Sequence, residues 1–509
     1  MSRAAPLPGA RRVTILLLTA LEFLQSGMVG FAAGPIMGEI GASPEEFSVA
    51  TAGYAALAVL TIAKQRWLVE RLGWRRYVQL SLVVFAVGAA ICAVSREFGE
   101  FFLGRCVMGL GGAAFMTSGR VMVQHFAPGP QRFGGIKFFA SGLGGGIALA
   151  PGLAALAVSE DAWSAIFVLL AVVALITAMI ASFALPSAPS EPHERSQSHP
   201  ILAVSLGAGS FLLLFVLQRM QYDFYSNLSL LVLGLGAAAL LLWHPFWLMR
   251  GHARPLLPLK ALAQKRYSVG LAIYFVAYVA LGANTYMLPV LMQRTLGFPW
   301  QIVGGFQSLG LSAALLTWFA MAWTLPRSPA PKKYFVAGFL ALAAFGWRLS
   351  GLTTGADLWR QILPALMLNG AFIMLLMATT ASQTFRDFQH HEGEMTSAQQ
   401  MKNMVGQIGT AVGVALATIL LQWRTTLHYS VLNGRFTAGD PVYGSAVQHL
   451  ADALSPHVAS GQAGAAAVAQ LALQLTQQAS LLACLDYFAL IAVVGLVGAA
   501  IMALQRVME

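Results

Sequence analysis

Long, almost uninterrupted apolar runs constrain this chain more than any other feature. Residues 16–31 read LLLTALEFLQSGMVGF, and comparable runs recur along most of the 509 residues. A spanning helix needs about 20 mostly apolar residues, because inside a bilayer every backbone amide must be satisfied within the segment itself. Hydrophobic residues make up 57% of the chain and charged residues 10%. The sequence therefore predicts an all-α membrane protein.

Fourteen apolar runs bounded by polar residues are candidate spanning helices. They lie at about residues 13–37, 47–64, 77–95, 98–125, 133–158, 163–185, 201–219, 225–248, 267–293, 300–325, 333–352, 358–386, 400–423 and 480–505. With the first loop placed outside, 22 of the 31 Lys and Arg residues fall in cytoplasmic segments, as the positive-inside rule requires. We therefore expect both termini in the cytoplasm, and the net charge of +11 implies no nucleic-acid partner.

Polar segments between the runs predict the domain organisation. The Pro/Ser-rich segment 186–199 has the composition of a linker, and the basic, Leu-rich segment 251–266 suits an amphipathic connector along the cytoplasmic leaflet. The chain therefore divides into an N-terminal six-helix bundle (1–185), the linker (186–199), two additional transmembrane helices (200–250), the connector (251–266) and a C-terminal six-helix bundle (267–505). The C-terminal bundle includes a long extracytoplasmic loop (424–479).

Three stretches, in chain order, resemble signature sequences of the major facilitator superfamily. They are RWLVERLGWRR (66–76) between the second and third helices, GRCVMGLGGA (104–113) in the fourth, and GIALAPGLAA (146–155) in the fifth. The matching positions are Glu70, Arg71, Gly73, Arg75, Arg76, Arg105, Gly109, Gly146, Ala150 and Pro151. The fourteen-helix count with an extra central pair is similar to the drug:proton antiporter branch of the EmrB/QacA type.

The resemblance implies a major facilitator fold of two six-helix bundles plus two extra central transmembrane helices, inserted in the inner (cytoplasmic) membrane. It also implies a proton-coupled exporter of drugs or toxic amphipathic molecules that works by alternating access. The implied partners are the small-molecule substrate, protons and the lipid bilayer. In a cell with an outer membrane, a periplasmic adaptor and an outer-membrane channel would join them.

Glu22 is the one acidic residue that the sequence places deep within the first six helices. An ionised carboxylate in the hydrocarbon is costly, so the neutral acid is favoured until a cation or a water path arrives. A proton carrier behaves in this way, although a structural ion pair is an alternative. Arg105 of the fourth helix is the expected partner of Glu22, either in direct contact or through water.

Other polar residues are candidates for the cavity and its gates. Those expected to line the substrate cavity are Gln25, Tyr274, Tyr278, Asn284, Asn369 and Gln407, with ordinary hydrogen bonding between helices as the alternative. Lys402, at the start of the thirteenth helix, and the loop residues Glu70, Arg71, Gly73, Arg75 and Arg76 are candidate gating contacts. Asp486 is expected to be a structural carboxylate near a helix N-terminus.

The sequence carries no pattern typical of an enzyme. It lacks a phosphate-binding G-x-x-x-x-G-K-[ST] motif, and its three cysteines lie within apolar runs rather than at metal-ligand spacing. We therefore predict no enzymatic activity, no cofactor and no metal, so transport would be secondary. Two alternatives stay open: a proton-coupled importer or metabolite exporter on the same fold, and a non-transporting membrane sensor or scaffold.

Overall fold

The computed structural model describes residues 8–127, 129–185, 195–197, 200–223, 226–249, 262–325, 327, 330–388, 392–434, 441–459 and 461–508. The helices before residue 250 are α1 (Pro8–Phe31), α2 (Ala33–Glu39), α3 (Pro44–Leu72), α4 (Trp74–Val94), α5 (Phe98–Gly112), α6 (Phe115–Gln124), α7 (Pro130–Ser159), α8 (Ser164–Ala184), α9 (Pro200–Asp223) and α10 (Leu228–Met249). Those after it are α12 (Lys265–Pro289), η2 (Val290–Thr295), α13 (Trp300–Leu311), α14 (Ala313–Thr324), α15 (Pro331–Ser350), η3 (Leu358–Ile362), α16 (Leu363–Thr384), η4 (Arg386–Phe388), α17 (Glu392–Asn433), α18 (Pro441–Leu454), η5 (Ser455–His457) and α19 (Ala463–Leu504).

Among the described residues, 13 helices are long and apolar enough to cross a membrane. The remaining one of the fourteen predicted helices is α15, a 20-residue helix with Lys332, Lys333 and Arg348 near its ends. These charges leave it outside the set of candidate spans, yet α15 packs along α16 and α19 like its neighbours. The all-helical membrane fold is therefore confirmed, whereas the count of fourteen spanning helices stays a prediction.

The packing of the helices against one another defines two groups that meet along a seam. In the first group α1 packs against α7 and α8, and α4 packs against α5 and α8. In the second group α12 packs against α17, and α15 packs against α16 and α19. Contacts of α7 with α13 and of α3 with α17 join the groups, and the additional helix α9 lies against both α3 and α17.

Glycines allow the close approach that these packings need. A Cβ at Gly142 of α7 would collide with Thr19 and the Leu16 carbonyl of α1, and a Cβ at Gly413 of α17 would collide with the Val279 carbonyl of α12. Without an apolar driving force in lipid, small residues at such crossings let backbones pack tightly. The glycine-rich stretches of the fifth and thirteenth predicted helices therefore act in packing within each group.

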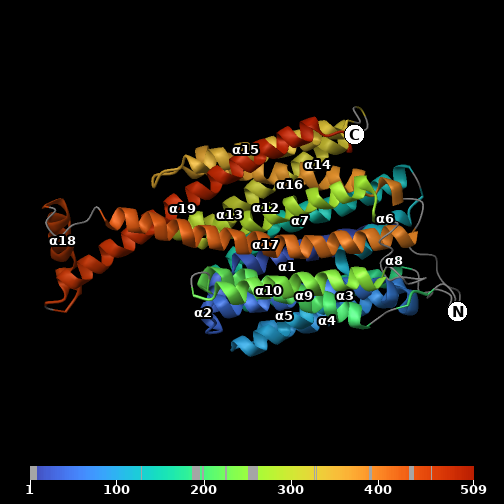
Figure 1. The fold of residues 1–509 in the computed structure, drawn as a ribbon, viewed down its shortest axis with the longest axis horizontal. Coiled ribbons are helices and arrows are strands. Elements are labelled where there is room, and N and C mark those ends of the chain that lie inside the picture. Colours follow the sequence, from blue (N-terminus) through green and yellow to red (C-terminus); the bar gives the residue numbers. More distant parts are fainter. Residues whose placement is uncertain are drawn as a thin grey trace.

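The last two long helices extend well beyond a bilayer. Both α17 and α19 have 42 residues, which at about 1.5 Å per residue is roughly twice the ~30 Å hydrocarbon core. They project together at one end of the molecule, where α18 lies between them in sequence (Figure 1). The region expected as loop 424–479 is thus largely helical in its described part, because α17, α18 and α19 extend into it.

The start of α1 and the end of the chain lie at the same end of the helical array. Arg11 donates to the carbonyls of Ala184 and His125, and Arg266 at the start of α12 donates to the Val507 carbonyl. Which side of the membrane this end faces stays a prediction, as does the division into domains. The connector 251–266 lies almost wholly outside the described residues, and of the linker 186–199 only residues 195–197 are described.

Candidate functional site

Glu22 lies halfway along α1 and faces the second group of helices. Gln407 of α17 donates a hydrogen bond from Nε2 to Glu22 Oε1 at 2.9 Å. Both side chains keep partial accessible surface although they sit deep between the groups. The carboxylate therefore spans the seam between the two halves of the chain, where relative motion of the halves would expose or cover it.

Lys402 is the basic residue that interacts electrostatically with Glu22. It precedes Gln407 on α17, and its side chain is buried. It also interacts electrostatically with Arg120. Its ammonium donates to Asn403 Oδ1 at 3.1 Å and lies 5.1 and 5.3 Å from the ring centres of Tyr274 and Tyr278. An ammonium with three donors thus has one amide and two aromatic faces around it, an environment poor in acceptors.

Arg105 of α5 is buried on the other side of Glu22. Its Nη1 donates to Gln25 Oε1 at 3.4 Å, and its guanidinium lies 4.4 Å from the ring centre of Tyr54. The ion pairs of the described residues include neither Arg105 nor Glu22. Of the two arrangements expected for Arg105 and Glu22, direct contact is therefore absent, and Arg105 instead contacts Gln25, one turn along α1 from Glu22.

We call these residues the central polar cluster: Glu22, Gln25, Tyr54, Arg105, Arg120, Tyr274, Tyr278, Lys402 and Gln407. Arg120 of α6 completes it by donating from Nη2 to the Ala381 carbonyl of α16 at 3.5 Å. That carbonyl belongs to the last turn of α16, where the helix dipole favours a cation. The cluster draws on six helices from both halves of the chain, α1, α3, α5, α6, α12 and α17.

The halves are in contact on both sides of the cluster. Toward the chain termini, Asn403 donates to Thr117 Oγ1 at 2.6 Å and Gln400 donates to the Ile62 carbonyl at 2.7 Å. Toward the opposite end, the Gly152 amide donates to Ser308 Oγ at 2.8 Å. The two halves therefore contact each other on both sides of the cluster.

Two predicted cavity residues lie elsewhere. Asn284 of α12 donates to Asn369 Oδ1 at 3.0 Å and accepts a 2.7 Å hydrogen bond from the Tyr487 hydroxyl. All three are buried inside the second group. The structure thus places Gln25, Tyr274, Tyr278 and Gln407 in the central polar cluster, but Asn284 and Asn369 in a separate network in which they bond to each other and to Tyr487.

Asp486 also differs from expectation in its surroundings. It lies in the middle of α19, so a helix N-terminus does not stabilise it. Its Oδ2 instead accepts from Arg424 Nε and pairs with His428 Nε2, both at 2.6 Å. The carboxylate joins α17 to α19 near the base of their projection, consistent with the structural role expected for it.

The residues of the fifth-helix motif lie on two faces of α7. A Cβ at Gly146 would meet the Ala20 carbonyl of α1, and Ala150 packs against Gly27 of the same helix. The Pro151 carbonyl approaches Gly304 of α13, from the other half. This motif therefore packs α7 simultaneously within its own half and across the seam.

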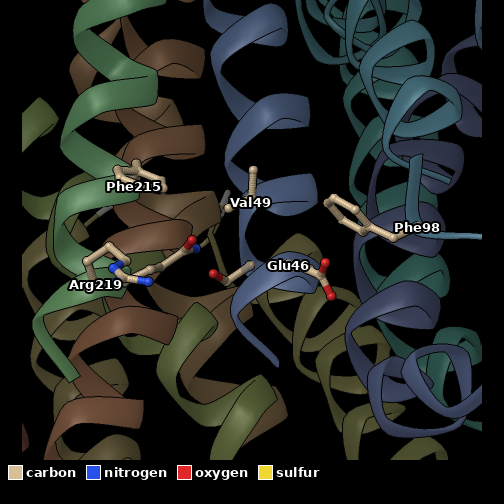
Figure 2. Close-up of a pocket in the computed structure, with 7 residues that line it drawn as sticks. Glu46, Val49, Phe98, Phe215 and Arg219 are labelled. Atoms are coloured by element: carbon tan, nitrogen blue, oxygen red, sulfur yellow. The ribbon is translucent and has the colours of Figure 1, made fainter. Parts of the chain in front are cut away.

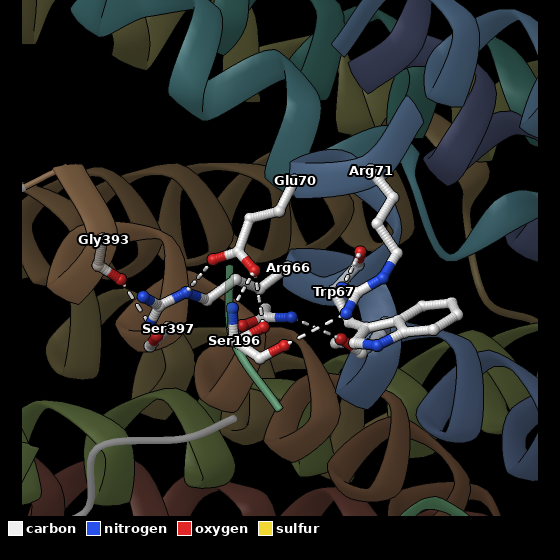
Figure 3. Close-up of polar contacts among 9 residues, drawn as sticks. Arg66, Trp67, Glu70, Arg71, Ser196, Gly393 and Ser397 are labelled. Carbon is white, nitrogen blue, oxygen red and sulfur yellow. Dashed lines mark hydrogen bonds and ion pairs between the residues drawn. The ribbon is translucent and has the colours of Figure 1, made fainter. Parts of the chain in front are cut away.

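The motif between α3 and α4 forms hydrogen bonds with Ser196 of the linker (Figure 3). The Ser196 amide and hydroxyl both donate to Glu70 Oε2 at 2.6 Å, and Arg66 Nε donates to Glu70 Oε1 at 2.8 Å. Arg71, stacked on Trp67, donates to the Ser196 carbonyl at 3.4 Å. We call Arg66, Glu70, Arg71 and Ser196 the linker latch, because these contacts attach Ser196 to the end of α3.

The remaining residues of this motif have simpler places. Gly73 adopts φ 78°, a conformation that favours glycine, and so allows α3 to end and α4 to begin at one residue. Arg75 is half-buried and Arg76 exposed in the first turn of α4. At the start of α17, Gly393 lies beside Arg66, so the latch also borders the second half of the chain.

The latch predicts a measurable effect of Glu70→Gln. The neutral amide loses charge-assisted hydrogen bonds worth about 1.5–3 kcal/mol each, so closure at this end should weaken. We expect a cysteine at Ser397, introduced without the native cysteines, to react with an impermeant maleimide about tenfold faster in inverted vesicles. Glu100→Gln, at the opposite end of the molecule, is the matched control, and equal labelling of both variants would exclude the latch.

A small pocket lies away from the cluster, between α3, α5 and α9 (Figure 2). Its volume is about 150 Å³, and its lining includes Glu46, Val49, Phe98, Phe215 and Arg219. Glu46 already serves as the capping-box residue of α3 with Ser43, and Arg219 pairs with Asp223. The pocket therefore has local structural explanations and is too small for a typical organic cargo.

Several residues of the site were not predicted from the sequence. Tyr54, Asn403, Thr117 and Gln400 stand in apolar or ordinary polar surroundings with no motif to distinguish them. Arg120, which reaches the Ala381 carbonyl of α16, was not among the candidates either. Its charge within an apolar run was the available signal, because a charge inside a spanning helix commonly faces a partner or a cavity.

Comparison with known proteins agrees with this architecture. The sequence profile described as Major Facilitator Superfamily matches residues 15–414. The MdtD protein of Escherichia coli O81 (strain ED1a), provisionally named a multidrug resistance protein, is 25% identical over 427 residues, covering 81% of this chain and 86% of that protein. MdtD of Shigella sonnei (strain Ss046) is also 25% identical, with the same coverage.

Solved structures share the fold at low sequence identity. The human organic anion transporter MFSD10 (TETRAN) covers 98% of this chain and 100% of its own, with a TM-score of 0.57 and 14% identity. A structure from work on proton-dependent oligopeptide transporters covers 97% and 99%, with the same TM-score and identity. The chain therefore belongs to the Major Facilitator Superfamily, as a multi-pass transporter of the inner membrane.

Proposed function

We propose that the chain is a proton-coupled secondary transporter that moves amphipathic small molecules across the inner membrane by alternating access, with Glu22 as its proton site. The observation that carries the proposal is the 2.9 Å hydrogen bond between Glu22 and Gln407, because it puts a carboxylate on the moving seam. A carboxylate there meets one side of the membrane at a time as the halves rock about the cluster.

The energetics favour a proton on this group during part of the cycle. When the halves part, water reaches Glu22 and the carboxylate can ionise; when they close, burial favours the neutral acid. A proton carried inward gains about 2.3 kcal/mol per 100 mV of membrane potential. The contacts between the halves on both sides of the cluster support a state in which Glu22 is accessible from neither side.

Export in exchange for protons is the first candidate cycle. It requires Glu22 to hold either a proton or a cationic cargo, and never both. The names of the E. coli and Shigella relatives support export of drugs. Co-transport of proton and cargo is the second candidate, and the excess of bases over acids in the central polar cluster favours it.

The test uses membranes from cells that produce the protein. Dye and drug candidates are added to inverted vesicles acidified by respiration, and whole cells are followed in parallel with a pH electrode. Cargo-induced proton release from vesicles indicates exchange, and alkalinisation of the medium during uptake by cells indicates co-transport. Cargo transport without proton movement in either preparation would contradict the proposal.

A further inference from the structure

The central polar cluster is unbalanced in charge. Its described members include three bases, Arg105, Arg120 and Lys402, and one acid, Glu22. Arg120 is partly compensated by the last turn of α16. The direct contacts of Arg105 and Lys402 are all with neutral groups, which are amide oxygens, a thioether and aromatic faces, and Glu22 is the one acid that interacts electrostatically with Lys402.

An excess of buried basic over acidic groups is energetically unfavourable in the middle of a membrane protein. A buried cation without a counter-charge is destabilising by several kcal/mol, and breaking a buried ion pair has a comparable cost. Acidic residues on the surrounding helices would neutralise these bases, but Glu22 is the one acidic residue that the sequence places at this depth. A ligand that brings a negative charge between Arg105 and Lys402 would remove the imbalance.

We propose that the cargo is an amphipathic organic anion whose acidic group binds between Arg105 and Lys402 when the halves part. The proposal rests on the proposed transport function and names the cargo class for the same site. A guanidinium offers a planar fork of donors that matches a carboxylate or sulfonate, and the ammonium of Lys402 has donors without protein acceptors.

Aromatic and thioether side chains near the two bases could contact the apolar part of the cargo. Tyr54, Tyr274 and Tyr278 present ring faces to the two bases, and Met108 lies against Arg105. These side chains would pack against an aromatic or aliphatic body once the bases turn toward its acidic group. A cationic cargo would instead enter a site that already holds three positive charges.

An anionic cargo fixes how proton and cargo are coupled. Ionised Glu22 repels an anion and attracts Lys402, so it opposes binding in two ways. Protonation of Glu22 removes both effects, and linkage requires that bound cargo favours the protonated acid to the same extent. Cargo and proton therefore bind together, and the cycle is co-transport.

Equilibrium binding to the purified full-length protein tests the cargo class without requiring proton coupling. Titration calorimetry compares 2-naphthoate with 2-naphthylmethylammonium, two probes with one ring system and opposite charges. We expect the carboxylate to bind at least about tenfold more tightly, a difference of about 1.4 kcal/mol. Failure of the carboxylate to bind more tightly than the ammonium would overturn the proposal.

Variants separate the proposed site from a general loss of folding. Arg105→Gln and Lys402→Gln should each weaken naphthoate binding about tenfold, and the control Lys333→Gln, at the exposed start of α15, should not. Glu22→Gln should strengthen naphthoate binding, which a misfolded protein could not do. Weaker naphthoate binding by Glu22→Gln would contradict the anion site, whereas proton-independent transport would contradict only the proposed function.

Discussion

Replacing Glu22 with Gln should abolish accumulation of cargo against its gradient while leaving exchange of cargo across the membrane. Glutamine keeps the size of the side chain and a hydrogen-bonding partner for Gln407, but it cannot gain or lose a proton. The two halves should still close around the seam. Without the proton, the imposed gradient has no group through which to act on the cycle.

The measurement uses the variant reconstituted in liposomes with an imposed pH gradient. We expect uphill accumulation to fall at least about 100-fold, which corresponds to about 2.7 kcal/mol of lost driving force. Counterflow of labelled against unlabelled cargo should continue. Glu39→Gln, at the exposed end of α2, is the control and should accumulate cargo normally; accumulation by Glu22→Gln at the normal level would exclude Glu22 as the proton site.

The second large effect is expected for Gly304→Leu. A side chain at this position of α13 would collide with Ala155 and with the Pro151 carbonyl of α7, across the seam between the halves. Overpacking of this kind typically costs about 1–3 kcal/mol, so the population closed at this end should fall about tenfold or more. The transport rate should fall with it, because alternating access needs closure at each end in turn.

The neighbouring glycine is a matched control. A Cβ at Gly305 meets no atom within 4 Å, so Gly305→Leu should transport and label normally. Access is measured at a cysteine replacing Ser308, without the native cysteines, by an impermeant maleimide added from the side opposite the chain termini. Faster labelling in Gly304→Leu than in Gly305→Leu is the expected result, and equal labelling together with normal transport would contradict closure at this contact.

The sequence predicted most of the membrane helices because the bilayer leaves few choices. A run of about 20 apolar residues must be helical in hydrocarbon, and each such run before residue 250 corresponds to described helices. Helix boundaries were predicted less well outside the hydrocarbon, where the chain meets water. Both α17 and α19 continue beyond their apolar runs through polar residues, where hydropathy does not distinguish a helix from a loop.

The candidate site was also predicted only in part. A charge in an apolar run is conspicuous, so Glu22, Arg105 and Lys402 could be selected from the sequence. Gln407 was also a candidate, but its pairing with Glu22 could not be predicted, because the two residues are 385 positions apart and become neighbours only through the packing of the two halves. The amides Asn284 and Asn369 show the converse: their polarity suggested a cavity, but a third buried partner, Tyr487, satisfies them within one half.

The central claim is that Glu22 itself takes up and releases the transported proton. Adding cargo to the purified protein in weakly buffered solution, with a pH indicator, tests this claim most directly. The wild type should change the proton content of the solution when cargo binds, with net uptake for an acidic cargo, and Glu22→Gln should bind cargo without such a change. An equal proton change in Glu22→Gln would contradict the account, because another group would then carry the proton.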